Sequence, residues 1–326
     1  MSAQENSSLV DQEGNFFSSN ATSNTIIVTD EIQVSLGVVM VMENVLSIIL
    51  LSKCTRLPFQ IRILTLNLAV SDILTGSFLA IPNSYVNEVY RCDIKKYPCF
   101  LFTNVSLLIF TMMNLDRCFA FVFAMQYYSF ITEKLIIRLC IFSWTFGCVL
   151  TYGMFFENGT GFGLSCEVMA FIERNTINMI FRCTTLCIIL PNLVIFGYLL
   201  HHIRKGLHKV HSRSVCFSRK QSKCVKKISL LTSVFLAAYF PFMIIYTFPV
   251  LDLSTMLGRK LYAVIVSIVL LNSACNPFFY VWRFKEPRYH LKKLLCFWNR
   301  EMILSIDRNY NQKNATYEIH VTSSSM

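Results

Sequence analysis

Charged side chains inside long apolar stretches are the residues of this sequence best suited to do chemistry. Asp116 and Arg117 stand side by side at the end of the apolar run "FTMMNLDRCFAF", and Asp72 lies inside another apolar run. A charge near lipid costs roughly 2.5–3.5 kcal/mol even on lenient scales, so such residues turn to a protein interior and find partners. The adjacent pair can neutralise itself and anchor the end of its apolar run. The buried carboxyl can hold a hard cation or serve as a hydrogen-bond donor.

The stretches that carry these residues are long enough to cross a membrane. Of the 326 residues, 54% are hydrophobic and 15% are charged, which is too apolar for an ordinary soluble domain of this length. A spanning helix needs about 20 residues. Seven windows reach that length, at 32–52, 61–82, 98–120, 136–156, 177–200, 229–250 and 261–282. The sequence therefore predicts an all-α membrane protein, a seven-transmembrane helix bundle with a short amphipathic C-terminal surface helix.

Basic residues in the short connections predict the orientation. The stretch 201–227 carries nine lysines and arginines and no acid, so we expect it to be cytoplasmic and the N-terminus to be extracellular. The chain then divides into an extracellular tail 1–31, a seven-helix domain 32–283, a membrane-surface helix 284–297 and a cytoplasmic tail 298–326. Glycosylation tripeptides at Asn6, Asn20 and Asn158 fall on the extracellular side. The net charge of +11 is accordingly a topology signal rather than a sign of nucleic-acid binding.

One polar or proline signature in each span resembles the rhodopsin-like (class A) G-protein-coupled receptors. The set covers roughly 32–297 and comprises Asn44, "LNLAVSD" ending at Asp72, "LDRCFAFVFAMQY", Trp144, Pro191, "FLAAYFPF" and "LNSACNPFFY". The pieces "AFVFAMQY" and "RFKEPRYHLKKLLC" look most like the adenosine, melanocortin and related amine-type branch.

This resemblance implies a cell-surface receptor that converts binding of an extracellular ligand into activation of a heterotrimeric G protein. Arrestin and receptor kinases are further expected partners. Tyr239 stands where tryptophan is usual, and Gln221 lies where some members carry an acid that pairs with the arginine, so ligand-independent basal signalling is the alternative. The residues that match the family's switch are Asp116, Arg117, Pro191, Phe235, Tyr239, Pro241, Asn276, Pro277 and Tyr280.

The resemblance also implies an ion site and covalent modifications. Glu43, next to Asn44, could join the ion site, relay protons or remain a neutral acid at a helix interface. Cys92 and Cys166 match the outer disulfide, with Cys99 as a rival partner, and Cys296 is placed for palmitoylation. The residues that match the family's sodium site are Asp72, Ser106, Asn272 and Asn276.

The implied ligand pocket is apolar and aromatic, which suits a small neutral or lipid-like molecule or a short peptide. Aminergic receptors carry an aspartate at the position of Cys99, and opsins carry a lysine at that of Leu270, so neither an amine anchor nor retinal is expected. Tight core filling is the alternative use of the pocket residues. They are Cys99, Thr103, Met243, Tyr246, Tyr262 and Val266.

Two other classes of protein fit the sequence less well. All six histidines lie in expected cytoplasmic segments, and neither an H-E-x-x-H motif nor a nucleophile elbow is present, so we expect no enzyme. Glu43 and Asp72 could line the path of an ion-conducting transporter or channel, but the internal repeats typical of many transporters are missing.

Overall fold

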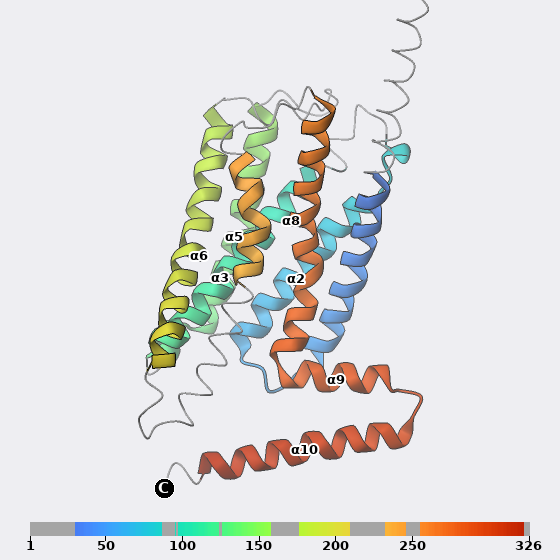
Figure 1. The fold of residues 1–326 in the computed structure, drawn as a ribbon, viewed down its shortest axis with the longest axis vertical. Coiled ribbons are helices and arrows are strands. Elements are labelled where there is room, and N and C mark those ends of the chain that lie inside the picture. The colour runs from blue at the N-terminus through green and yellow to red at the C-terminus, as the bar shows by residue number, and fades with distance from the viewer. Residues whose placement is uncertain are drawn as a thin grey trace, which may run out of the picture.

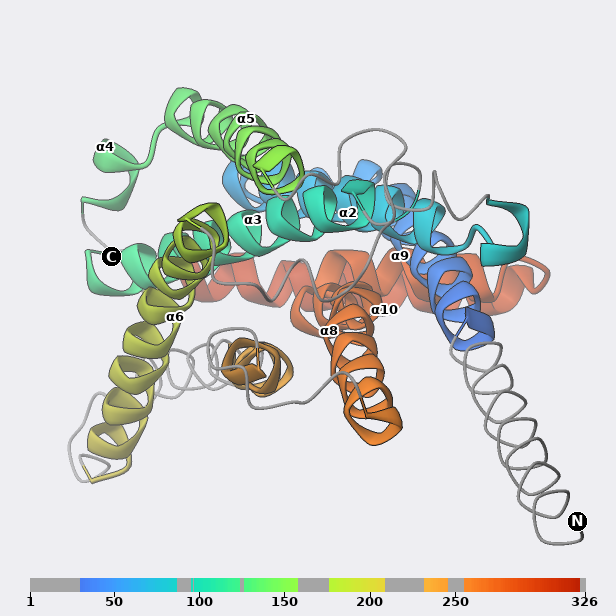
Figure 2. The same cartoon turned by 90° about the horizontal axis from the view of Figure 1, so that it is seen from above.

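The computed structural model describes residues 30–86, 95, 97–123, 126–157, 176–208, 232–245 and 255–322, and within these ranges every regular element is a helix. Figures 1 and 2 show the long helices side by side along one axis, with α3 running obliquely through the bundle. The helices of the bundle are Asp30–Ser52, α2 (Phe59–Leu79), α3 (Tyr97–Val122), α5 (Glu133–Glu157), α6 (Thr176–His208), Thr232–Ile245 and α8 (Met256–Arg283). Each of the seven predicted spans coincides with one of them, which confirms the helical bundle.

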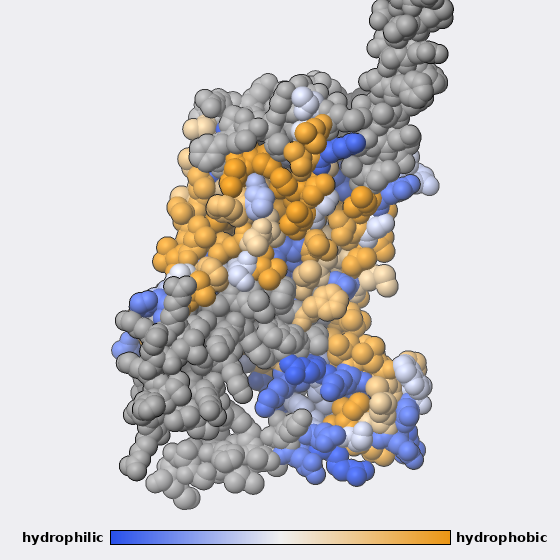
Figure 3. Space-filling view, in the orientation of Figure 1, coloured by the Kyte–Doolittle hydropathy of each residue, from blue (hydrophilic) through white to orange (hydrophobic). Residues whose placement is uncertain are grey.

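The apolar surface of these helices matches the membrane expectation. Four described helices are long and apolar enough to cross a bilayer, namely Asp30–Ser52, Phe59–Leu79, Tyr97–Ala120 and Glu133–Gly153. Shorter apolar segments follow at Arg182–Tyr198, Thr232–Ile245 and Lys260–Asn276. Hydrophobic side chains cover the middle of the visible face in Figure 3, and hydrophilic ones gather at the end that carries α9 and α10. Large apolar side chains such as Val149 and Val194 point outward, as lipid-facing residues do.

Close packing between the first helix and α2 depends on two glycines. A Cβ added at Gly37 would lie 2.6 Å from the backbone nitrogen of Ala80, and one added at Gly76 would lie 2.8 Å from the carbonyl oxygen of Gly37. Only hydrogen at both positions lets the two backbones approach this far. Small residues serve the same purpose at many helix crossings in membranes, where packing replaces the hydrophobic driving force.

The main core lies where α3 meets the helix Thr232–Ile245. The Phe110 and Phe235 rings stack with centroids 4.0 Å apart, and Tyr239 continues the stack at 4.5 Å from Phe235. Phe235 is 1% exposed, so this aromatic column fills the centre of the bundle. α3 also contacts α2, α5 and α6 and is the helix around which the others assemble.

A largely buried ion pair joins the beginning of the first helix to the segment that precedes α3. The Nζ of Lys95, ahead of α3, lies 3.1 Å from the Asp30 carboxylate and 3.1 Å from the Asn83 side-chain oxygen. Asp30 also accepts the backbone N–H of Asn83 at 2.9 Å. The beginning of the first helix is therefore fastened to the short helix η1 (Asn83–Tyr85) and to the start of α3.

Two helices follow the bundle. α9 (Lys285–Leu295) crosses the end of α8, as expected for the surface helix, and α10 (Arg300–Thr322) runs back beneath it (Figure 1). Only a tail is expected from the sequence after residue 297, so α10 is a helix that the sequence did not predict. Asp307 of α10 accepts the Tyr289 hydroxyl at 2.7 Å and pairs with Lys293 of α9 at 3.0 Å, and the Tyr289 and Tyr310 rings stack.

Candidate functional site

A buried carboxyl group joins three helices near the middle of the bundle. Asp72 of α2 is 0% exposed and accepts hydrogen bonds from Ser106 Oγ of α3 at 2.9 Å and from Asn276 Nδ2 of α8 at 2.8 Å. Ser273, one helical turn before Asn276, is a further hydrogen-bond partner. The structure thus brings together three of the four residues expected at the sodium site. Asn272 is buried on the same helix, and no hydrogen bond joins it to Asp72 among the described residues.

Oxygen atoms dominate this cluster and fit a hard monovalent cation. Ser106 and Asn276 donate to different carboxylate oxygens of Asp72, at 2.9 and 2.8 Å, and with Ser273 as a third partner the carboxylate still keeps a lone pair for an ion. Glu43 lies on the side of the first helix that is near α8, where its charge acts on the Cys275 thiol. Its Oε2 is buried without a hydrogen-bond partner in the described part of the chain. That position corresponds to the helix-interface alternative for Glu43.

A second polar cluster, not predicted from the sequence, lies between α3, α6 and the helix Thr232–Ile245. Asn114 Nδ2 donates to Asn192 Oδ1 at 2.8 Å, and Asn192 Nδ2 donates to Thr111 Oγ1 at 2.9 Å. Thr232 Oγ1 reaches Asn114 Oδ1 at 3.4 Å. The signal in the sequence is an asparagine inside each of two apolar spans, because a buried amide must find partners. These bonds join three helices, and Asn114 lies two residues before Asp116 in α3.

The charged pair at the end of α3 has a third member. Asp116 is 4% exposed and receives the Nε of Arg117 at 2.8 Å on one oxygen. The Tyr127 hydroxyl donates to its other oxygen, and Arg117 Nη2 also approaches that hydroxyl at 3.4 Å. Tyr127 belongs to the short helix α4 (Tyr127–Phe130), which follows α3. Both oxygens of the carboxylate are therefore occupied, and the guanidinium is held by its neighbour.

A small cavity opens beside this pair. Its wall contains Asp116 and Arg117 together with apolar side chains of α2 and α3, and Phe284 at the start of α9 closes one side. The apolar lining residues are Ile61, Leu64 and Met113. The arginine is thus bordered by a space that a small shift of the surrounding helices would change.

The other expected switch residues lie on the helices that were predicted to carry them. Pro191 is inside α6, and Pro241 is inside the helix Thr232–Ile245, where a missing N–H favours a bend. Phe235 and Tyr239 form the aromatic column described above. Pro277 and Tyr280 belong to α8, but their side chains lie outside the described part of the structure, as does Gln221.

The expected ligand-pocket residues are divided between two clusters. Cys99 and Val266 pack against the same buried group near the start of α3, whereas Met243 belongs to the main core and is 4% exposed. The Cys99 thiol is free and lies 3.8 Å from the Thr75 carbonyl oxygen. Thr103 and Tyr262 are half-buried on α3 and α8. Tyr246 lies outside the described residues, as do Cys92, Cys166, Asn6, Asn20 and Asn158.

Comparison with known proteins identifies the family. The profile of the 7 transmembrane receptor (rhodopsin family) matches residues 43–280. Among similar proteins are trace amine-associated receptor 2 from Homo sapiens, 24% identical over 76% of this chain and 77% of its own length, and trace amine-associated receptor 4 from Mus musculus, 23% identical over 75% and 79%. A trace amine-associated receptor 365 from Petromyzon marinus is 22% identical over 63% and 62%.

These matches confirm the resemblance read from the polar signatures, and they agree with its amine-type branch. Members of this family are membrane receptors, not enzymes, and the polar clusters along α3 occupy the spans from which the resemblance was drawn. The chain belongs to the rhodopsin family of seven-transmembrane receptors.

Proposed function

We propose that this protein is a cell-surface receptor that converts binding of an extracellular ligand into activation of a heterotrimeric G protein. The observation that carries the proposal is the group formed by Asp116, Arg117 and Tyr127 at the end of α3. The carboxylate of Asp116 restrains the Arg117 guanidinium, and this contact can break on activation. The N-terminus is extracellular and the end with α9 is cytoplasmic in this proposal, because the basic connections gather there.

Opening the restraint needs little energy at the edge of a membrane. Arg117 is 16% exposed in its side chain, so water reaches the pair and the interaction is on the order of 1 kcal/mol. A change of that size shifts a two-state population severalfold. Thr232 lies on the helix Thr232–Ile245 and bonds at 3.4 Å to Asn114 of α3, which lies close to Asp116 in the chain. Displacement of the helix Thr232–Ile245, which contains Pro241, breaks this bond.

A sodium ion bound to Asp72 stabilises the resting form. Its ligands are the carboxylate of Asp72, the Ser106 hydroxyl and the side-chain oxygens of Asn272 and Asn276, with Ser273 as a further hydroxyl. The ion supplies positive charge to a carboxylate that is 0% exposed. These residues join α2, α3 and α8, so a bound ion opposes their separation. Receptor kinases and arrestin act on the cytoplasmic side after activation.

The ligand is a small neutral or lipid-like molecule or a short peptide. The relatives are named for trace amines, and a protonated amine would need a carboxylate in the outer half of the bundle. Cys99, near the beginning of α3, offers a thiol at the position where aminergic receptors have an aspartate, and Asp30 is already paired with Lys95. Cys99, Val266 and Tyr262 present an apolar and aromatic surface instead.

The decisive experiment is a G-protein dissociation panel in cells that express the receptor at a measured surface density. Signalling is recorded first without ligand and then with amines, nucleosides, lipids and peptides. We expect a response to a neutral compound in the parent and loss of coupling in Arg117→Ala at equal surface density. A response to amines alone would overturn the ligand class. Coupling that survives Arg117→Ala would overturn the switch, and a constant signal unaffected by every ligand class would indicate ligand-independent signalling.

A further inference from the structure

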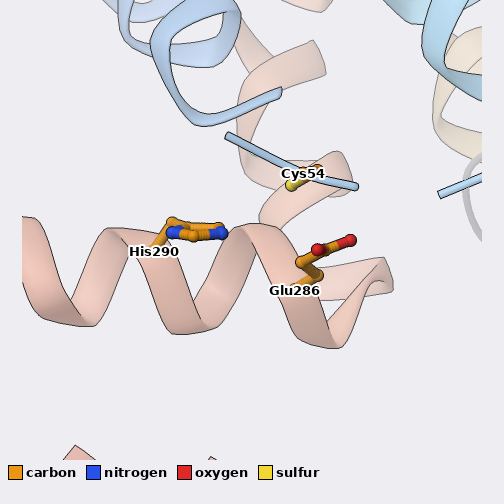
Figure 4. A group of neighbouring side chains, drawn as sticks. All are labelled: Cys54, Glu286 and His290. Atoms are coloured by element: carbon orange, nitrogen blue, oxygen red, sulfur yellow. The ribbon is translucent and has the colours of Figure 1, made fainter. Parts of the chain in front are cut away.

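A cysteine, a glutamate and a histidine meet where the first helix turns into α2. Cys54 follows the first helix and is 0% exposed, and Glu286 and His290 come from α9 (Figure 4). One ligand atom from each residue, the Cys54 sulfur, a Glu286 carboxylate oxygen and a His290 ring nitrogen, lies within 4.8 Å of the other two. Glu286 and His290 are four residues apart on a helix, which puts both on one face, and that face is turned to the loop.

Surrounding contacts already hold the three side chains in place. Glu286 accepts the backbone N–H groups of Thr55 at 2.9 Å and of Arg56 at 3.1 Å, which fixes its carboxylate against the loop. His290 makes a hydrogen bond with the backbone of Lys53. A histidine that donates one ring N–H to a carbonyl leaves its other nitrogen free to accept, and metal-bound histidines are commonly oriented in this way. The Cys54 sulfur lies 3.2 Å from the Leu50 carbonyl oxygen.

The three ligand types define the metal. A thiolate, an imidazole and a carboxylate are the donors that Zn²⁺ takes, with four-coordinate geometry and bonds of about 2.0–2.3 Å. Calcium and magnesium prefer oxygen alone. Bonds of that length place the ligand atoms closer together than 4.8 Å, so binding requires the Cys54 and His290 side chains to move toward the Glu286 carboxylate. Thiolate and carboxylate together carry two negative charges, which balance the double positive charge of the ion. The basic Lys53 and Lys293 lie close to His290, so this compensation is needed there.

We propose that Cys54, Glu286 and His290 bind one Zn²⁺ ion, with water as its fourth ligand, and that the ion fastens α9 to the loop after the first helix. Cys54 binds as the thiolate, and its proton passes to water as the sulfur–zinc bond forms. The bond joins residues more than two hundred positions apart in the chain. This site lies outside the switch and the Asp72 cluster, so it does not depend on the proposed signalling function.

Cobalt(II) is a direct probe of the site, because its bond to a thiolate gives a charge-transfer band in the near ultraviolet. The full chain is purified in detergent, stripped with a chelator and titrated with Co²⁺. We expect a thiolate band that saturates at one equivalent and disappears when Zn²⁺ is added. In Cys54→Ser, whose hydroxyl keeps the contact with Leu50, the band is lost. In His290→Gln it weakens, and the ion binds less tightly.

Two matched variants serve as controls, Cys148→Ser on the exposed surface of α5 and His201→Gln on α6, and both should keep the band. A second readout is the melting temperature, which Zn²⁺ should raise in the parent and in both controls but not in Cys54→Ser. The proposal is overturned by a band that persists in Cys54→Ser, or by a parent that shows no band at one equivalent. Should Cys54→Ser fail to fold, His290→Gln decides with the same two readouts.

Discussion

Tyr127 allows the switch to be tested without changing a charge. Tyr127→Phe removes the hydroxyl that occupies one oxygen of Asp116, and a lost hydrogen bond to a charged group costs roughly 1.5–3 kcal/mol. We expect basal G-protein dissociation to rise about tenfold or more at equal surface density, because Asp116 loses one of the two partners that it has among the described residues. Asp116→Asn should raise it further, since it weakens both contacts.

Tyr85→Phe is the control for this experiment, because Tyr85 is 83% exposed at the opposite end of the bundle. Basal signalling in Tyr127→Phe equal to that of Tyr85→Phe would mean that the hydroxyl does not restrain the arginine. The charged pair would then be an anchor of α3.

Asp72 is the residue that decides the sodium proposal. In Asp72→Asn the amide keeps contact with Ser106 and Asn276 but loses the negative charge that attracts a cation. We expect sodium to raise the melting temperature of the parent and to leave that of Asp72→Asn unchanged. Ser273→Ala removes a hydroxyl from the cluster and should weaken the sodium effect without abolishing it. Equal sodium sensitivity in Asp72→Asn and the parent would place the ion elsewhere.

At the scale of the elements, the crossing of the first helix and α2 gives a clear packing test. Gly76→Ala puts a methyl group 2.8 Å from the Gly37 carbonyl oxygen, so the helices must separate. Overpacking of this kind costs roughly 1–3 kcal/mol, and we expect a lower melting temperature and less receptor at the surface.

Gly197→Ala is the matched control on α6, because a Cβ there meets no atom within 4 Å. Alanine is favoured over glycine in a helix by roughly 0.8–1 kcal/mol, so this variant should be as stable as the parent or slightly more stable. Equal melting temperatures for Gly76→Ala and Gly197→Ala would show that the two helices separate at the crossing without loss of stability.

The contact between α9 and α10 should respond to pH. The hydrogen bond from Tyr289 lowers the pKa of Asp307, and the bond to Asp307 raises the pKa of Lys293. A depressed aspartate pKa contributes stability above its ordinary range, and this contribution is lost as pH falls through the lowered pKa. A raised lysine pKa contributes stability below its ordinary range, and this contribution is lost as pH rises through the raised pKa. The contact is therefore firmest between the two.

Spin labels on α9 and α10 can measure this contact as a distance distribution. We expect Asp307→Asn to broaden the distribution at neutral pH, and the parent to broaden only in acid below the ordinary aspartate range or at strongly alkaline pH. Glu301→Gln, an exposed change in the first turn of α10, should match the parent. An unchanged distribution in Asp307→Asn would assign the docking to the stacked Tyr289 and Tyr310 rings.

At the scale of the whole molecule, the orientation in the membrane is open to a direct test. Asn6, Asn20 and Asn158 are acceptors only if the N-terminus and the connection after α5 are extracellular. We expect a glycosidase to shift the mobility of the parent, and each Asn→Gln change to remove part of that shift. Asn314→Gln, in the tripeptide of α10, should leave it unchanged. A parent without any glycan-dependent shift would contradict the proposed orientation.

The number and order of the bundle helices could be predicted because apolar windows report on lipid contact residue by residue. The window 177–200 ends earlier than α6, which runs from Thr176 to His208, because hydropathy marks the membrane and not the helix. α10 has no apolar window at all. Its only signal is the spacing of Ile303, Ile306 and Tyr310, which are half-buried along one face.

The cluster residues were predictable only in part, because their partners depend on how the helices rotate against one another. Asp116 and Arg117 are neighbours in the chain, so their pairing needed no knowledge of the fold. Ser273 meets Asp72, and Asn192 meets Asn114, across helices whose facing sides no single sequence reports. Polar residues in apolar spans therefore indicate that a site exists, and the packing decides its members.

The hydrogen bonds between Glu286 and the loop after the first helix have a consequence for biosynthesis. Thr55 donates its backbone N–H to a carboxylate that lies 231 residues later in the chain. At about 5–20 residues per second, the ribosome needs roughly 10–50 s to deliver that carboxylate after the loop has emerged. During this interval the backbone N–H groups of the loop must bond to water or to a chaperone instead. A chain that ends after α8 lacks Glu286, so the backbone N–H groups of Thr55 and Arg56 never gain this partner. We expect such a chain to remain in the endoplasmic reticulum although all its spans have been inserted.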